Sequence, residues 1–424
     1  MTPALFTALF VAALATMFFV QSWLGARQVT NVIRHRDCVP EAFAVRIPLA
    51  AHQKAADYTI ARQRFARVDR IVDLVLTVAL TLGGGVALGA LLTAALPAPW
   101  NDVVLIGALA VASGVIGLPL AWWRTFVLEA RFGFNRTTLA TWLSDIAKGV
   151  ALSIVLGLPL LLAVLWLVRH GGTYWWLWVW VVWITFQLLM LVLYPTVIAP
   201  IFNKFSPLPA GDARARIEAL LARVGFAARD LFVIDGSRRS SHGNAYFVGF
   251  GRARRIVFFD TLLATLAPRE VESVLAHELG HYKLKHVAKS LVLSAAASLA
   301  LLALLAWIGG APWFYAGLGV ADPQAATRPG VMLCLFVLAL PPFAFLASPL
   351  VAMYSRRHEF EADAFAARNA SAEALADALV KMYEDNASTL TPDPLHSAFY
   401  DSHPPAAVRI AHLASLAREM PASM

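Results

Sequence analysis

Two histidines one helical turn apart are the residues of this chain whose spacing most clearly allows chemistry. His277, Glu278 and His281 form the motif H-E-x-x-H. In a helix, residues four apart lie on one face, so both imidazoles could bind a single zinc ion. Glu278 could then accept the proton of a water that zinc acidifies. His286, five residues after His281, is rotated off this face, and we expect it at the surface. The motif predicts a hydrolytic site with one zinc ion per chain.

Such a site needs a third protein ligand and an open position for water. The long metzincin motif would supply a histidine at 287 after a glycine at 284, but the chain has Leu284 and Val287. An acidic ligand from another helix is the remaining option. Glu359 and Asp363 stand four residues apart, directly after the last apolar run. One could bind zinc while the other accepts the remaining N–H of a ligand histidine. A solvated helix charge is the alternative.

Long apolar runs indicate the elements that must position these residues. The chain has 424 residues, of which 59% are hydrophobic and 15% charged, whereas soluble domains carry about 25% charged residues. Seven runs are long enough to span a membrane. They lie near residues 4–24, 71–96, 103–123, 149–168, 174–199, 290–308 and 330–352. Pro341 and Pro342 should kink the last run.

The distribution of basic residues predicts the topology. With seven spans, residues 25–70, 124–148, 200–289 and the tail from 353 share one face, and they hold 33 of the 35 Lys and Arg residues. The positive-inside rule places that face in the cytosol and the N-terminus outside. The net charge of +8 therefore reflects topology, and we expect no nucleic-acid partner. No basic residue precedes Arg27, so the first run is interpreted as a retained span rather than a cleaved signal.

The spans divide the chain into four segments. Residues 1–199 hold five spans with cytosolic loops, and residues 200–289 form a metalloprotease segment with short strands and the H-E-x-x-H helix. Residues 290–352 hold spans six and seven, and residues 353–424 form a cytosolic segment with the acidic ligand. In the second segment, we expect an amphipathic helix near 210–225 and another helix near 266–287. Between them we expect strands at 231–235, 244–249 and 255–259, with Gly251 in the turn between the last two strands.

The chain resembles the type I CAAX prenyl proteases, a family of integral-membrane zinc metallopeptidases, over nearly its whole length. Besides H-E-L-G-H, the matching stretches are residues 129–138, 194–195 with 200–203, 242–247, 359–363, and 403–405 with Arg409. The resemblance implies an all-α integral membrane protein with seven transmembrane helices forming a chamber. It also implies an α-rich zinc metalloprotease domain that carries a small β-sheet or hairpin. The Ala- and Arg-rich composition suggests a bacterial source and hence the bacterial inner membrane.

The resemblance implies a role for each matching residue of the site. Glu359 matches the glutamate that is the third zinc ligand in the family, which leaves Asp363 as the acceptor for a ligand histidine. Arg409 resembles a residue that organises the site from behind. A surface arginine is the alternative for this position.

Three further residues match family positions near the substrate. Asn244 and Ala245 resemble an edge strand that pairs with an extended peptide, and backbone pairing gives affinity without demanding one sequence. His403 matches a histidine near the metal, where it could stabilise the oxyanion while Glu278 moves the proton. A loop histidine fixed by the following proline is the alternative for His403.

Two other functions stay open at this stage. Because bacteria generally lack protein prenylation, the enzyme could be a quality-control protease that acts on non-prenylated membrane proteins, although residues 129–138 favour the prenyl-protease branch. A transporter or a non-catalytic membrane chamber is the alternative from another class. Spans nearly free of charge and an intact Glu278 argue against it. The expected partners are membrane lipids and a peptide or protein substrate, with or without a lipid group.

Overall fold

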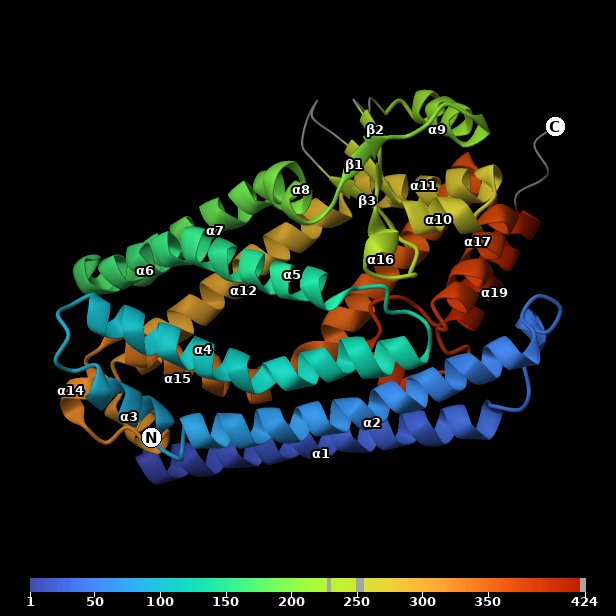
Figure 1. Cartoon of the computed structure of the whole chain (residues 1–424). Helices are drawn as coiled ribbons and strands as arrows, with labels where there is room; N and C mark the ends of the chain where they lie inside the picture. Colours follow the sequence, from blue (N-terminus) through green and yellow to red (C-terminus); the bar gives the residue numbers. More distant parts are fainter. Residues whose placement is uncertain (227–229, 249–254, 420–424) are drawn as a thin grey trace.

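Helices make up most of the structure, a computed structural model that describes residues 1–226, 230–248 and 255–419 (Figure 1). The helices of the first half are α1 (Pro3–His35), α2 (Leu49–Leu80), α3 (Gly85–Leu92), α4 (Trp100–Trp123), α5 (Leu139–Leu152), α6 (Leu158–His170), α7 (Trp175–Leu193) and α8 (Ala199–Phe202). The helices of the second half are α9 (Asp212–Arg223), α10 (Asp260–Thr265), α11 (Pro268–Lys283), α12 (His286–Gly309), α13 (Pro312–Gly317), α14 (Pro323–Ala326), α15 (Pro329–Ala344), α16 (Ser348–Asn369), α17 (Ala372–Asp385), α18 (Pro394–Tyr400) and α19 (Ala406–Glu419).

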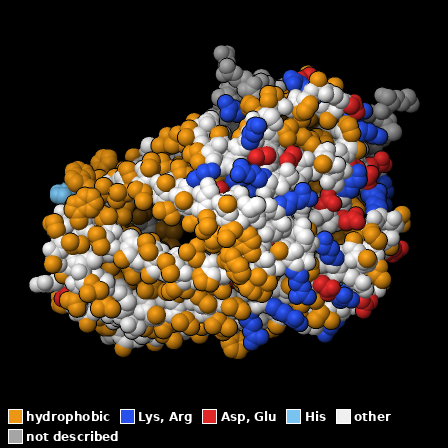
Figure 2. Space-filling model, viewed as in Figure 1, with side chains coloured by type: hydrophobic (Ala, Val, Ile, Leu, Met, Phe, Trp, Pro, Cys, Tyr) orange, Lys and Arg blue, Asp and Glu red, His pale blue; other side chains and the backbone are white. Residues whose placement is uncertain are grey.

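The long apolar helices have the properties of membrane spans. Within the described residues, six are long and apolar enough to cross a membrane, and a seventh span results if the bent pair α2 and α3 is counted as one. In five of the six, no more than 11% of the most apolar window is buried, so most of its side chains are exposed. On the face drawn in Figure 2, hydrophobic side chains cover the part formed by these helices, whereas charged ones gather near the sheet and the C-terminal helices. The protein is therefore a multi-pass membrane protein.

The bend in the second predicted span, 71–96, has a local cause. α2 ends at Leu80 and α3 begins at Gly85, with 51° between their axes. Three successive glycines, Gly83 to Gly85, lie at this break, and Gly84 has φ 76°. Only glycine adopts this left-handed conformation without a steric penalty, so it ends the first helix and lets the second start at a new angle.

After the last predicted span, the chain stays helical beyond the end of the apolar run. α15 contains Pro341 and Pro342, and a short 3₁₀ turn, Phe345–Ala347, separates it from α16. The expected interruption thus lies a few residues after the prolines. α16 carries the chain from the span directly to Glu359 and Asp363.

A four-stranded sheet lies beside the helix that carries the H-E-x-x-H motif. Its strands are β1 (Phe205–Pro207), β2 (Asp230–Ile234), β3 (Ala245–Val248) and β4 (Arg255–Phe259), in the order β1-β2-β4-β3. β2 and β4 are parallel, and the other two pairs are antiparallel. The strands predicted from the sequence are β2, β3 and β4; β1 was not predicted. The predicted turn residue Gly251 lies outside the described residues.

The core beneath the sheet fixes the orientation of α11. Val271, Leu275 and Leu279 recur at intervals of four and are nearly fully buried among residues of α9, β4, α17 and α19. The opposite side of α11 packs on α16. At this crossing, a Cβ on Gly280 would lie 3.0 Å from the Cα of Ala362. The glycine of the motif therefore allows the close helix approach that brings α16 to the two histidines.

Candidate metal centre

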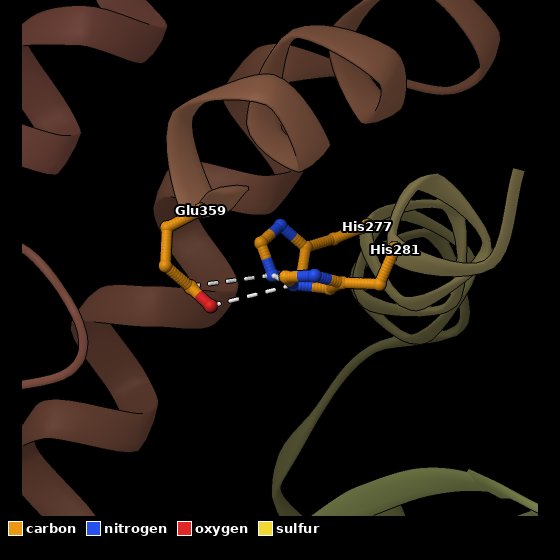
Figure 3. Close-up of side chains that lie close together, drawn as sticks. All are labelled: His277, His281 and Glu359. Atoms are coloured by element: carbon orange, nitrogen blue, oxygen red, sulfur yellow. Dashed lines mark hydrogen bonds and ion pairs between the residues drawn. The ribbon is translucent and has the colours of Figure 1, made fainter. Parts of the chain in front are cut away.

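Three potential metal ligands converge where α11 and α16 cross (Figure 3). The Nε2 atoms of His277 and His281 are 3.1 Å apart. Glu359 places one carboxylate oxygen 3.5 Å from Nε2 of His277 and the other 3.3 Å from Nε2 of His281. Among the residues that the structure describes, these three form the one cluster of His, Cys, Asp or Glu with metal-ligand spacing.

The chemistry of these three residues fits a bound cation. Oε2 of Glu359 is buried without a hydrogen-bond donor, and such an atom is costly unless another group compensates it. Burial alone would raise the pKa of Glu359, but its interactions with His277 and His281 hold that pKa well below its usual range. The pKa of His277 is raised to about 9 because Asp363 and Glu359 outweigh the effect of burial. Glu359 is therefore held as an ionised carboxylate, and the groups around His277 favour a positive charge on its ring.

A buried ion-pair network supports the ligands from behind. Asp363 has no exposed surface and accepts from Nδ1–H of His277 at 2.8 Å, as expected for a residue that orients a metal ligand. Arg409, 4% exposed on α19, donates from Nε and Nη2 to the two oxygens of Asp363 at 2.8 and 2.6 Å. Its Nη1 lies 3.4 Å from Glu359. Arg409 is thus a buried partner of both carboxylates, not a surface arginine.

Glu278 and His403 lie beside the three clustered residues. Burial raises the pKa of the Glu278 carboxyl above its ordinary value, while the neighbouring His277 and His281 oppose this shift. Glu278 does not belong to the ligand cluster. His403 is 62% exposed, and its Nε2 lies 3.4 Å from Glu359. Its other ring nitrogen is 3.0 Å from Oγ of Ser402.

His286 does not lie at the surface, and the sequence-based expectation was wrong. The expectation assumed that the helix continued through this residue. Instead, α11 ends at Lys283, and Lys285 adopts φ 59° before α12 begins at His286. This turn folds His286 back against His281, where it is 3% exposed. A positive φ at a lysine has no clear signal in a single sequence.

Asn244 directly precedes β3, and Ala245 is its first residue. β3 is an edge strand of the sheet and packs against α11. The carbonyl of Asn244 accepts from the N–H of Phe259 on β4 at 2.9 Å. Backbone groups of successive residues alternate in direction, so those of Ala245 point to the open edge. The N–H of Ala245 bonds to the side-chain oxygen of Asn244 at 2.8 Å. The structure therefore places both residues at an edge that an extended chain could join.

The stretch 129–138, to which the sequence assigned no role, connects the membrane helices to this edge strand. Glu129 accepts from the hydroxyl of Tyr58 on α2. Phe134 stacks on His242 with ring centroids 4.8 Å apart, and its carbonyl accepts from the backbone N–H of Ser241. The segment that leads into β3 is thus held against the membrane domain by contacts distant in sequence.

Comparison with known proteins agrees with this architecture. Residues 28–204 match the family model described as CAAX prenyl protease N-terminal, five membrane helices, and residues 207–417 match Peptidase family M48. A CAAX prenyl protease 1 homolog of Arabidopsis thaliana is 34% identical over 415 residues, which cover 94% of this chain and 95% of the relative. The homolog of Oryza sativa subsp. japonica is 39% identical over a stretch that covers 74% of this chain and 73% of the relative.

A solved structure extends the agreement to three dimensions. The crystal structure of S. mikatae Ste24p superposes with a TM-score of 0.89 at 30% sequence identity, covering 96% of this chain and 99% of the other. The resemblance noted in the sequence is therefore confirmed, as is the fold class of membrane helices combined with a small mixed sheet. The chain belongs to peptidase family M48 and is a membrane-embedded metallopeptidase of the CAAX prenyl protease 1 group.

Proposed function

We propose that the catalytic metal is zinc, held by His277, His281 and Glu359. The observation that carries this proposal is the convergence of two imidazole Nε2 atoms and one carboxylate within ligand spacing of each other. Two histidines and a glutamate are a donor set of catalytic zinc sites, which keep one position open. A zinc ion there would polarise the scissile carbonyl and acidify a water.

The side chains of the site have separate tasks in this proposal. Glu278 accepts the proton of the attacking water and delivers it to the leaving amine, which suits a carboxylate whose pKa is raised by burial. His403 donates a hydrogen bond to the oxyanion that develops on the carbonyl. Asp363 holds the N–H of His277 and so keeps its Nε2 free for the metal.

The substrate would bind as an added strand on β3, with its backbone beside Asn244 and Ala245. Replacing Ala245 with proline removes one outward N–H, so we expect kcat/KM to fall by about 2- to 10-fold, the value of one hydrogen bond. Proline is tolerated on an edge strand when its nitrogen faces away from the ladder. The control Ala245→Ser keeps the N–H and should cleave like the wild type. Equal kcat/KM for the proline and serine variants, with unchanged melting temperatures, would contradict the added-strand model.

The proposed site and topology are consistent with each other. α11 and α16 belong to the segments 200–289 and 353–424, which the basic residues assign to the same cytosolic face. We therefore propose that the metal centre faces the cytosol, with the N-terminus outside. For a chain of this Ala- and Arg-rich composition, the membrane would be the bacterial inner membrane. The four predicted segments remain the proposed division of the chain.

For the substrate, we propose a lipidated C-terminal peptide, since the relatives are named CAAX prenyl proteases. The test uses detergent-purified full-length protein with one peptide in farnesylated and non-lipidated forms, and fragments are identified by mass spectrometry. We expect release of the C-terminal tripeptide from the farnesylated form, loss of cleavage after chelation, and recovery with zinc. Equal cleavage of both peptides would instead favour a quality-control protease. Stable protein that neither binds zinc nor cleaves would support a non-catalytic chamber.

A further inference from the structure

His281 has a second partner that no motif assigns. Its Nε2 faces His277 and Glu359, while its Nδ1 lies 3.0 Å from Nδ1 of His286. Nε2 of His286 lies 3.0 Å from a carboxylate oxygen of Glu361. The three side chains therefore form a continuous line from the metal centre to a carboxylate on α16.

The acceptor at the end of this line determines where every proton lies. An ionised carboxylate can only accept, so Nε2 of His286 must carry a hydrogen. In the neutral ring, Nδ1 of His286 is then an acceptor, and the facing Nδ1 of His281 must donate. That assignment leaves Nε2 of His281 as a bare lone pair, which is the form that binds a metal. The opposite direction would place a hydrogen on the ligand nitrogen.

We infer that His286 and Glu361 are positioning residues that fix the tautomer and ring orientation of His281. The inference rests on the proposed zinc site. It also explains a difference between the two ligand histidines: His277 donates directly to the carboxylate Asp363, whereas His281 reaches a carboxylate through one imidazole. Hydrogen-bond partners behind a ligand typically raise metal affinity 10- to 100-fold.

The surrounding contacts hold the hydrogen-bond relay of His281, His286 and Glu361 in one arrangement. His286 is 3% exposed, and its ring stacks on His358 with centroids 4.0 Å apart and planes 6° from parallel. Glu361 is further bonded to Nε of Arg357 at 3.1 Å. The left-handed Lys285 directs His286 toward His281 at the first position of α12. A ring constrained from several sides keeps its acceptor aimed at His281.

The test measures zinc affinity of detergent-purified full-length variants by competition with a fluorescent chelator, and the melting temperature of the zinc-free forms. His286→Leu removes the acceptor and should bind zinc about 10- to 100-fold more weakly. His286→Asn places an amide oxygen near the position of Nδ1 and should recover most of this loss. Glu361→Leu alters a partly exposed residue, keeps the fold, and should weaken zinc by about 10-fold. His358→Phe keeps the stacked ring and serves as the control with wild-type affinity.

A packing role for His286 gives a different pattern. Affinity would then follow the melting temperature of the zinc-free protein, and asparagine would not restore it. Wild-type affinity in Glu361→Leu or His286→Leu would overturn the relay while leaving the zinc site intact. Failure of the wild type to bind zinc would refute the proposed function itself.

Discussion

Replacing Glu278 with glutamine is expected to lower peptide cleavage by about 10²- to 10⁴-fold while zinc remains bound, since this is the usual contribution of a positioned general base. Glutamine has nearly the same shape but cannot accept the proton of the attacking water. Glu278 is not one of the three clustered ligands, so its replacement leaves the donor set intact. Single-turnover cleavage rates and metal content of the purified variant measure the two parts of this prediction.

The matched control for Glu278→Gln is His281→Ala, which removes a ligand. This variant should lose both activity and zinc, because two remaining donors hold the metal much less tightly. The contrast separates a proton-transfer role from a metal-binding role. A cleavage rate of Glu278→Gln within about tenfold of the wild-type rate would exclude Glu278 as the general base. Loss of zinc from that variant would show that the glutamate supports the metal instead.

The membrane helices could be predicted because their signal is local. A run of about 20 apolar residues is sufficient to identify a span. Six of the seven predicted runs fall on a helix long and apolar enough to cross a membrane, and the run 71–96 falls on the bent pair α2 and α3. The bend between α2 and α3 was missed because the apolar run continues across the glycines. β1 was missed because three residues ending in a proline carry too little alternation to indicate a strand.

From the sequence, only those site residues could be predicted whose positions are related by helical spacing. The sequence alone suggested His277 and His281 as ligands because four residues make about one helical turn. It left Glu359 and Asp363 as alternatives, since spacing cannot tell which carboxylate of a shared face approaches the metal. The resemblance selected Glu359, and the structure places it at the histidines. The contacts of His286 depend on a non-helical turn and on tertiary packing, neither of which has a short sequence pattern.

Arg409→Met is expected to destabilise the metal-free protein by about 3–5 kcal/mol, the usual cost of breaking a buried ion pair by removing one partner. Arg409 bonds to both oxygens of Asp363 and approaches Glu359 at 3.4 Å, and all three side chains are at most 6% exposed. Burial alone would raise the pKa of Asp363, but Arg409 and His277 lower it. Without the guanidinium, two carboxylates one helical turn apart share the low-dielectric interior with less positive charge.

Bound zinc should reduce this loss, because the cation compensates part of the same negative charge. The melting temperature of Arg409→Met is therefore expected to fall most in the zinc-free form. The difference in melting temperature between the zinc-loaded and zinc-free protein should then be larger for Arg409→Met than for the wild type. Arg409→Lys keeps the charge but loses the planar fork that binds both oxygens of Asp363, so its stability should be intermediate. If zinc-free Arg409→Met melted at the wild-type temperature, the stability of this centre would arise from packing around α11, α16 and α19 rather than from the buried ion pair.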